Sequence, residues 1–434
     1  MKRLCIHVLI VMIFVALVGC SSGESPSTGV KDEELTTIRY LTSNLESEGT
    51  VKVLTDISEE YTKVNPSVKL EYYYVGQSGL RQRIQLLAAS NDLPTMFSFE
   101  SGRPLRNLKG EVLDLEQTFK DLGIYEKLNP VAVNLLKQQT HGEGLYALPL
   151  ELNIEGFWYN KSLFAKLGIE EPRTWDDMLR AADHFIENGI QPFSVAGKEK
   201  WPITRLIGGY AVRKYGPDVM ESVENGEMKV TAPGFIEAAQ TVYDMSMKGY
   251  FGGDANKIDL QTSIDLFLQG QAAMFYSGSW ELRDFNNPVR NKLGADGIGY
   301  FNIPLVKDGI GTLDEFPMNA GLTNSFSKAA FNSKVGEWMK TVFSEYGDRA
   351  MRDNGLITGF KVEHMPAQVP PLTQLVQEKI ESAKRAVLWF EAGFDSKTQS
   401  IAWDNAQLLI SGEGMTAQSY MEELQKAIDA QQSN

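Results

Sequence analysis

The stretch Thr37-Ile38-Arg39-Tyr40-Leu41-Thr42 predicts a β-strand, because β-branched and aromatic residues dominate it. A helical pattern follows over residues 50–64, and residues 68–75 are again rich in β-forming side chains. A second helical pattern covers residues 79–90, and an apolar run fills residues 95–99. Strands that alternate with helices in this way are typical of a parallel α/β sheet.

The same alternation returns in the second half of the chain. Thr174-Trp175-Asp176-Asp177 fits a capping box, and apolar residues at helical spacing follow it. Further helices are expected from residue 232 to about 247 and from residue 416 to about 431. Two α/β lobes are the simplest architecture for this pattern, and the cleft at their boundary is the natural ligand site.

The composition excludes several functions. Hydrophobic residues make up 43% of the 434 residues, which suits a well-buried globular protein. The formal net charge of −14 disfavours nucleic acid and anionic lipid as partners, because both require a basic surface.

The only cysteines are Cys5 and Cys20, so the chain after residue 20 has no thiol. His141, His184 and His364 form no spaced ligand motif, and we expect neither a metal site nor a cofactor.

The first residues resemble an export signal. A basic start and an apolar run over residues 4–17 predict a signal peptide over residues 1–19. This run is shorter than the ~18 residues expected of a membrane-spanning helix. Leu17-Val18-Gly19-Cys20 resembles the bacterial lipobox, which implies that Cys20 carries a lipid. Residues 20–35 are rich in Ser, Gly, Pro and acidic residues and predict a flexible tether. An uncleaved N-terminal anchor is the alternative.

Five short motifs, in this order, resemble one family. They are Gly144–Pro149 (GLYALP), Gly156–Phe164 (GFWYNKSLF), Pro172–Met178 (PRTWDDM), Phe267–Phe275 (FLQGQAAMF) and Gly278–Trp280 (GSW). The chain is similar, from about residue 38 to 428, to the extracellular solute-binding lipoproteins of ABC importers. The resemblance is to the carbohydrate-binding branch, called family 1, which is related to maltose-binding protein.

The resemblance implies a fold and its division. It implies a two-lobed α/β fold of the periplasmic-binding-protein type II, with a mainly parallel, helix-flanked sheet in each lobe and a ligand cleft between the lobes. The expected N-lobe comprises residues 36–152 plus 306–362. The expected C-lobe comprises residues 153–305 plus 363–434. The lobes are expected to close on a ligand about the segments that cross between them.

The stretch Glu151-Leu152-Asn153-Ile154-Glu155 alternates polar and apolar residues, as a strand does. We expect its polar face to be turned to water and, from the resemblance, to line the cleft floor. Glu151 and Asn153 are therefore candidate ligand-binding residues, since carboxylates and amides bond sugar hydroxyls. Asn153 stands where maltose-type relatives carry a ligand-binding glutamate. The alternative is an exposed face of an ordinary strand.

Tryptophans are the second group of candidates, because a flat ring can cover the apolar face of a pyranose. The resemblance implies that Trp280, in the Gly-x-Trp motif, contacts the ligand. Trp201, which precedes a proline, matches a family sugar platform, and Trp389 lies in the region of a third stacking aromatic. Each could instead be a packing residue. Trp175 and Trp338 lie on expected helices and are assigned to the core.

Loops that follow strands supply the remaining candidates, because the carboxyl ends of parallel strands bind ligands in open α/β sheets. Asn44 follows the first strand, and Glu100 and Ser101 follow the run that ends at Phe99. Asn319 is a further candidate. The alternative for each of these residues is a polar loop side chain that is exposed to solvent and binds no ligand.

The expected function is to capture a sugar or oligosaccharide and deliver it to the membrane permease of an ABC importer. The alternatives are a lipid-anchored, glycan-active hydrolase and a binder of a non-sugar solute. A glycosidase needs two carboxylates ~5 to 10 Å apart. Glu151 and Glu155 would lie roughly 13 Å apart along one strand, so we expect no enzyme.

The expected partners and location follow from the same reasoning. They are a mono- or oligosaccharide and the permease subunits, with no nucleic acid and with membrane contact only through the lipid on Cys20. We expect a monomer outside the cytoplasm, anchored to the cell membrane. The resemblance, together with the lipobox, suggests a Gram-positive bacterium.

Overall fold

The computed structural model describes residues 35–46, 49–294 and 296–433. The predicted signal peptide, Cys20 and the tether up to residue 34 lie outside these residues. Residues 36–434 form one compact unit, which contains every element described below. Within the described ranges, none of the helices combines the length and the apolar character needed to cross a membrane.

The first sheet confirms the strands and helices expected from residues 37 to 99. Its order is β2-β1-β3-β9, and β1 runs parallel to both β2 and β3, whereas β9 is antiparallel to β3. Helices α1 and α2 connect the first three strands. The bounds are β1 Thr36–Thr42, α1 Gly49–Val64, β2 Val68–Tyr74, α2 Gln77–Ala89, β3 Met96–Phe99 and β9 Thr323–Phe326.

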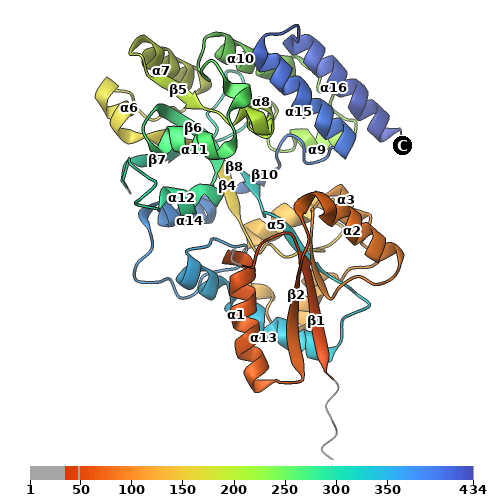
Figure 1. The fold of residues 1–434 in the computed structure, drawn as a ribbon. Helices are drawn as coiled ribbons and strands as arrows, with labels where there is room; N and C mark the ends of the chain where they lie inside the picture. Colours follow the sequence, from red (N-terminus) through yellow and green to blue (C-terminus); the bar gives the residue numbers. More distant parts are fainter. Residues whose placement is uncertain (1–34, 47–48, 295, 434) are drawn as a thin grey trace, which may run out of the picture. The chain divides into compact units, whose positions relative to one another are not determined.

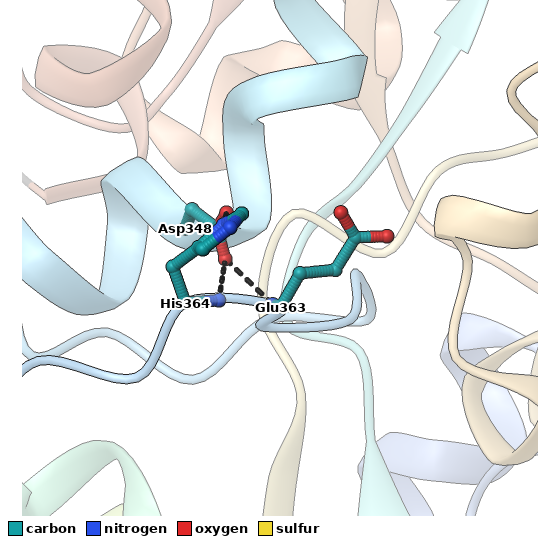
Figure 2. A group of neighbouring side chains, drawn as sticks. All are labelled: Asp348, Glu363 and His364. Carbon is teal, nitrogen blue, oxygen red and sulfur yellow. Dashed lines mark hydrogen bonds and ion pairs between the residues drawn. The ribbon is translucent and has the colours of Figure 1, made fainter.

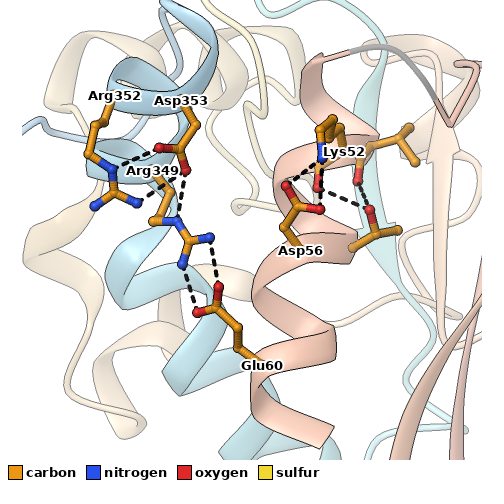
Figure 3. A network of polar contacts seen from close by, with 8 residues as sticks. Lys52, Asp56, Glu60, Arg349, Arg352 and Asp353 are labelled. Atoms are coloured by element: carbon orange, nitrogen blue, oxygen red, sulfur yellow. Dashed lines mark hydrogen bonds and ion pairs between the residues drawn. The ribbon is translucent and has the colours of Figure 1, made fainter. Parts of the chain in front are cut away.

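Helix α13 (Ser333–Asn354) packs beside α1 (Figure 1). Trp338 is buried between them and donates from Nε1 to Ser58 Oγ over 3.1 Å, which confirms its assignment to the core. At the surface, the Arg349 guanidinium donates to both oxygens of Glu60, over 2.9 and 3.0 Å, and to Asp353 over 2.9 Å (Figure 3). These contacts fix the last turns of α13 against α1.

The second sheet is mixed, so the expectation of a mainly parallel sheet is wrong for this lobe. Its order is β10-β8-β4-β6-β5, and β7 also pairs with β4. The central strand β4 is antiparallel to β6, β7 and β8, whereas β5–β6 and β8–β10 are parallel pairs. Alternation of side chains shows which residues share a face of a strand, and it carries no information on a partner's direction. The bounds are β4 Asn153–Asn160, β5 Gln191–Ser194, β6 Ala272–Gly278, β7 Ile298–Phe301, β8 Glu315–Asn319 and β10 Arg385–Val387.

The polar face expected over residues 151–155 is turned to water only in part: Glu151 is half-buried, whereas the prediction is wrong for Glu155. Strand β4 begins at Asn153, which is 7% exposed, and Glu155 is fully buried. A central strand is covered on both faces, and here Arg205, whose side chain is only 14% exposed, lies against the Glu155 carboxylate. At Glu155, the alternation of polar and apolar residues therefore results from a buried polar network rather than from a solvated surface.

Helices and short 3₁₀ turns surround the two sheets (Figure 1). The helices expected near residues 232–247 and 416–431 are confirmed as α10 and α16. The remaining bounds are α3 Arg103–Arg106, α4 Leu115–Asp121, η1 Tyr125–Lys127, α5 Pro130–Gln139, α6 Lys161–Leu167, α7 Trp175–Glu187, η2 Gly197–Glu199, α8 Trp201–Tyr215, α9 Val219–Glu224, α10 Pro233–Met247, η3 Ala255–Lys257, α11 Leu260–Leu268, η4 Ser279–Glu281, α12 Leu282–Phe285, α14 Pro371–Ser382, α15 Ser396–Ser411 and α16 Ala417–Gln432.

The expected capping box is present at the start of α7. Thr174 Oγ1 accepts from the Asp177 amide over 3.1 Å, and Asp177 Oδ2 accepts from the Thr174 amide over 3.0 Å. We expect Thr174→Ala to lower the free energy of unfolding by about 1 kcal/mol, because the helix start loses a side-chain acceptor and the reciprocal bond is weakened. Urea unfolding measures this loss. An unchanged midpoint would show that the cap contributes nothing to stability.

Candidate functional site

A cavity of about 740 Å³ lies where the N-terminal end of β4, η4 and the C-terminal end of α13 meet. This volume is within the range of ordinary small-molecule sites. Polar side chains and one tryptophan line it, among them Glu151, Asn153, Ser279, Trp280, Glu281 and Arg352. Three of the sequence-predicted site residues, Glu151, Asn153 and Trp280, are therefore brought to one cavity.

Trp280 is positioned by the turn that follows β6. Gly278 ends this strand, and a Cβ at Gly278 would clash with the six-membered ring of Trp280, so the indole lies directly over the glycine. The indole Nε1 donates to Glu281 Oε1 over 2.9 Å. The Trp201 ring lies 5.8 Å from the Trp280 ring, at an interplanar angle of 70°. Both tryptophans keep partial exposure, so their ring surfaces are not fully used in packing.

Glu151 and Asn153 are held by their neighbours. Gly321 has a φ of +60°, and a Cβ there would come within 2.6 Å of Glu151 Oε2, so the carboxylate depends on a glycine at this turn. Asn153 Oδ1 accepts from Ser279 Oγ over 3.1 Å. Ser279 belongs to the same short turn as Trp280. One acid, one amide and one aromatic ring thus share a wall of the cavity.

Glu281 is a buried carboxyl in this wall. It is 4% exposed, and its Oε1 accepts from Ser277 Oγ over 3.1 Å and from the Trp280 indole. Burial raises the pKa of Glu281 to about 7, although both hydrogen bonds act in the opposite direction. Within the described part of the chain, no lysine, arginine or histidine forms an ion pair with it.

Arg205, on α8, lies beside Trp201 and Trp389. Its Nε donates to Glu155 Oε2 over 3.0 Å, and its Nη1 forms an ion pair with Glu391. Its guanidinium carbon lies 5.8 Å from the Trp201 ring centroid and 5.4 Å from that of Trp389. Burial acts against the charge of Arg205, but the two carboxylates outweigh it and raise the pKa. Arg205 therefore belongs to a network of two carboxylates and two tryptophans.

The other predicted residues lie at different distances from the cavity. Asn319 pairs with Asn153 across β4 and β8 and donates to Glu155 Oε1 over 3.0 Å. Asn44 Nδ2 donates over 3.3 Å to Thr50, which lines the cavity. Trp389 is not among the residues that line it, and its ring centroid lies 5.4 Å from the Arg205 guanidinium carbon. The loop residues Glu100 and Ser101 are not among those that line it, and Glu100 forms an ion pair with Arg81.

Sequence reasoning did not identify Glu281, Glu391 or the C-terminal turn of α13 as parts of this region. Glu281 directly follows the Gly-x-Trp motif, so its place in the chain was a usable signal. Glu391 accepts from Trp403 Nε1 over 2.9 Å and from Thr204, contacts that join distant parts of the chain. No local pattern carries such a signal. Trp175 is 2% exposed, as expected of a core residue.

A second cavity, of about 560 Å³, lies between α5 and β10. Its basic side chains are already paired, as Lys137 with Glu116, Lys384 with Asp314 and Arg385 with Asp218. Among the described residues that line it there is no tryptophan, tyrosine or phenylalanine. It therefore lacks the aromatic surface that distinguishes the first cavity.

Asp348, Glu363 and His364 form the one cluster in the described residues with ligand atoms close enough for a metal ion. Asp348 Oδ1 accepts from the amides of Glu363 and His364, over 2.6 and 2.9 Å, and its Oδ2 lies 2.7 Å from His364 Nδ1 (Figure 2). Glu363 forms an ion pair with Lys127 over 2.6 Å. These contacts explain why the three side chains lie together: they hold the loop at residues 363–364 against α13.

A two-sheet α/β fold with a polar cavity that contains a tryptophan is typical of ligand-binding proteins. The sequence model of the bacterial extracellular solute-binding proteins matches residues 47–343, and the chain belongs to this family.

Named relatives and a solved structure agree with this assignment. The chain is 23% identical over 310 residues to a multiple sugar-binding protein of Streptococcus mutans, a match that covers 68% of each chain. It is 26% identical over 277 residues to the melibiose/raffinose/stachyose-binding protein MelE of Bacillus subtilis, covering 62% of this chain and 61% of the relative. A chitin oligosaccharide binding protein superimposes with a TM-score of 0.78 at 24% identity, covering 92% of this chain and 100% of that one.

The raised pKa of Glu281 predicts a pH-dependent stability. The folded protein holds this proton up to about pH 7, whereas the unfolded chain releases it near 4.5. Wild-type stability relative to Glu281→Gln should therefore fall as the pH rises from about 4.5 to about 7, by up to about 3 kcal/mol. Urea unfolding of both proteins at pH 5 and pH 8 measures this difference. A difference that does not change with pH would contradict the assignment.

Proposed function

We propose that this protein is the substrate-binding component of an ABC transporter, and that it captures a sugar or oligosaccharide and delivers it to the membrane permease. The single observation that supports this most is the position of Trp280, a partly exposed ring beside Glu151 and Asn153 in one cavity. An indole can cover the C–H face of a pyranose, and the acid and the amide can bond its hydroxyls. Two relatives are named as sugar-binding proteins, and their names support a sugar as the ligand of this chain.

We propose a carrier rather than a hydrolase. Of the carboxylates Glu151 and Glu155, the second is fully buried and bonded to Arg205, Tyr276 and Asn319, so it has no access to a substrate. Release of smaller sugars from an oligosaccharide incubated with the protein would support the alternative of a glycan-active enzyme.

We propose that the chain forms two lobes, residues 36–152 plus 306–362 and residues 153–305 plus 363–434, that close on the ligand. Strand β8 lies within the range 306–362 and pairs with β4 where Asn153 faces Asn319, so the two proposed lobes meet in the second sheet. A ligand that contacts both lobes would favour the closed form. Small-angle scattering that finds no compaction with a bound sugar would count against this closure.

We propose that the protein acts outside the cytoplasm of a Gram-positive bacterium, as a monomer anchored through a lipid on Cys20 after removal of residues 1–19. The order of basic, apolar and small residues before Cys20 supports this. A tagged fatty acid supplied to the cells should label the wild type and not Cys20→Ala. A membrane-bound wild type without label would favour an uncleaved anchor instead.

The experiment that tests the function is a thermal-shift panel of melibiose, raffinose, stachyose and a chitin oligosaccharide. A sugar at about 100 times its Kd stabilises the native state by about 2.7 kcal/mol, which a melting scan resolves. We expect at least one sugar to raise Tm. If every sugar is silent with a folded protein, the ligand belongs to another class of solute.

A further inference from the structure

Glu281 is placed where its charge state bears on the proposed sugar site. It lines the same cavity as Trp280, and the Trp280 indole donates to it. The indole and the Ser277 hydroxyl both donate to the same oxygen, Oε1. A carboxylate can accept several more bonds than these two, so a ligand hydroxyl has acceptor capacity to use.

The charged groups around Glu281 do not neutralise it. Asp284, on α12, opposes the ionisation of Glu281, whereas Arg290 favours it. Arg290 is itself engaged by Asp284 over 2.8 Å and by Asp265 over 2.9 Å. The other charged side chains that line the cavity are Glu151, Arg283 and Arg352. Burial without an ion-pair partner therefore leaves the carboxyl sensitive to any new hydrogen-bond donor.

We propose that Glu281 is a specificity-determining residue that gives up its proton when a sugar hydroxyl donates to it, so that sugar binding is coupled to pH. This inference rests on the proposed function, because it requires a hydroxyl-bearing ligand in this cavity. The bond that forms joins the ligand O–H to the carboxylate, and the displaced proton goes to the solvent. Hydrogen bonds to an ionised acceptor are stronger than those to a neutral one, so the ligand favours the ionised form.

The coupling has a definite size and direction. With a pKa of about 7 in the free protein, the ionised form is a minor species at pH 6 and the major one at pH 8. Apparent affinity falls with the fraction of the binding-competent form. Binding should therefore be about tenfold weaker at pH 6 than at pH 8.

The first measurement concerns the free protein. Intrinsic tryptophan fluorescence titrated from pH 5 to pH 9 should show a transition near pH 7, since the ionising carboxyl contacts the Trp280 indole. The transition should be absent in Glu281→Gln, which keeps an oxygen acceptor, and in Trp280→Phe. Asp284→Asn should move the midpoint to lower pH, because it removes the nearby negative charge. An identical transition in Glu281→Gln overturns the proposal.

The second measurement concerns the complex. Calorimetric titration with the sugar that gives the largest melting shift in the panel, in two buffers of different ionisation enthalpy at pH 7, should show proton release in the wild type and none in Glu281→Gln. Binding by the wild type without pH dependence or proton release overturns the coupling and leaves the proposed function intact. A silent panel overturns the proposed function and, with it, the coupling to a ligand. Circular dichroism of each variant confirms that it is folded.

Discussion

Arg205→Met is expected to lower the free energy of unfolding by about 3 to 5 kcal/mol, a much larger loss than that expected for Thr174→Ala. The guanidinium bridges Glu155 and Glu391, two buried carboxylates that lie far apart in the sequence. Its removal leaves two buried charges without their cation, and methionine fills the volume but supplies no donor. Urea unfolding with linear extrapolation measures the loss.

Two further variants test the cause of this loss. Glu155→Gln and Glu391→Gln, added to Arg205→Met, remove both uncompensated charges and should recover part of the stability. Arg180→Met is the matched control, because Arg180 is exposed and forms an ion pair with Asp177 at the surface. It should change stability by less than about 1 kcal/mol. Equal losses in Arg180→Met and Arg205→Met would contradict the buried network around Arg205.

Trp280→Ala is expected to weaken sugar binding by at least about thirtyfold, equivalent to about 2 kcal/mol or more. The substitution removes the ring that is expected to cover the sugar and also the Nε1 donor to Glu281. The fold should persist, because Trp280 is only partly buried. Isothermal titration with the best sugar of the panel measures the change in Kd.

Two controls separate the contributions of the ring and of its N–H group. Trp280→Phe retains a stacking surface and loses the hydrogen bond to Glu281, so its affinity should lie between those of the wild type and Trp280→Ala. Tyr74→Ala removes an aromatic residue that is 53% exposed at the end of β2 and should leave Kd unchanged. An unchanged Kd in Trp280→Ala would show that the sugar binds elsewhere.

The first sheet and its helices were predictable in detail because their patterns are local. Strand β1 and helix α1 begin within one residue of the expected positions. The capping box at Thr174 is likewise complete within four residues. Such elements are specified by periodicity and by capping residues, both of which a single sequence displays.

The second sheet and the buried network were not predictable in this way. The antiparallel partners of β4 lie more than a hundred residues away along the chain, at β6, β7 and β8. Glu155 looked like a cleft residue because strand alternation does not distinguish a solvated face from one covered by an arginine side chain. Only the fold brings Arg205 and Glu391 to it.

The central residues of the candidate site were predictable from the sequence, but the neighbouring residues that hold them in place were not. Trp280 came from the Gly-x-Trp motif, and Glu151 and Asn153 came from the strand pattern combined with the family resemblance. All three line one cavity. Their supporting neighbours, such as Gly321 against Glu151, depend on tertiary contacts between segments far apart in sequence.

The crystal structure of the protein with the best sugar of the panel tests the central claim most directly. The account predicts a pyranose ring stacked on Trp280, with hydroxyls within hydrogen-bond distance of Glu151 and Asn153. A sugar bound outside this cavity, or inside it without contact to Trp280, would contradict the account.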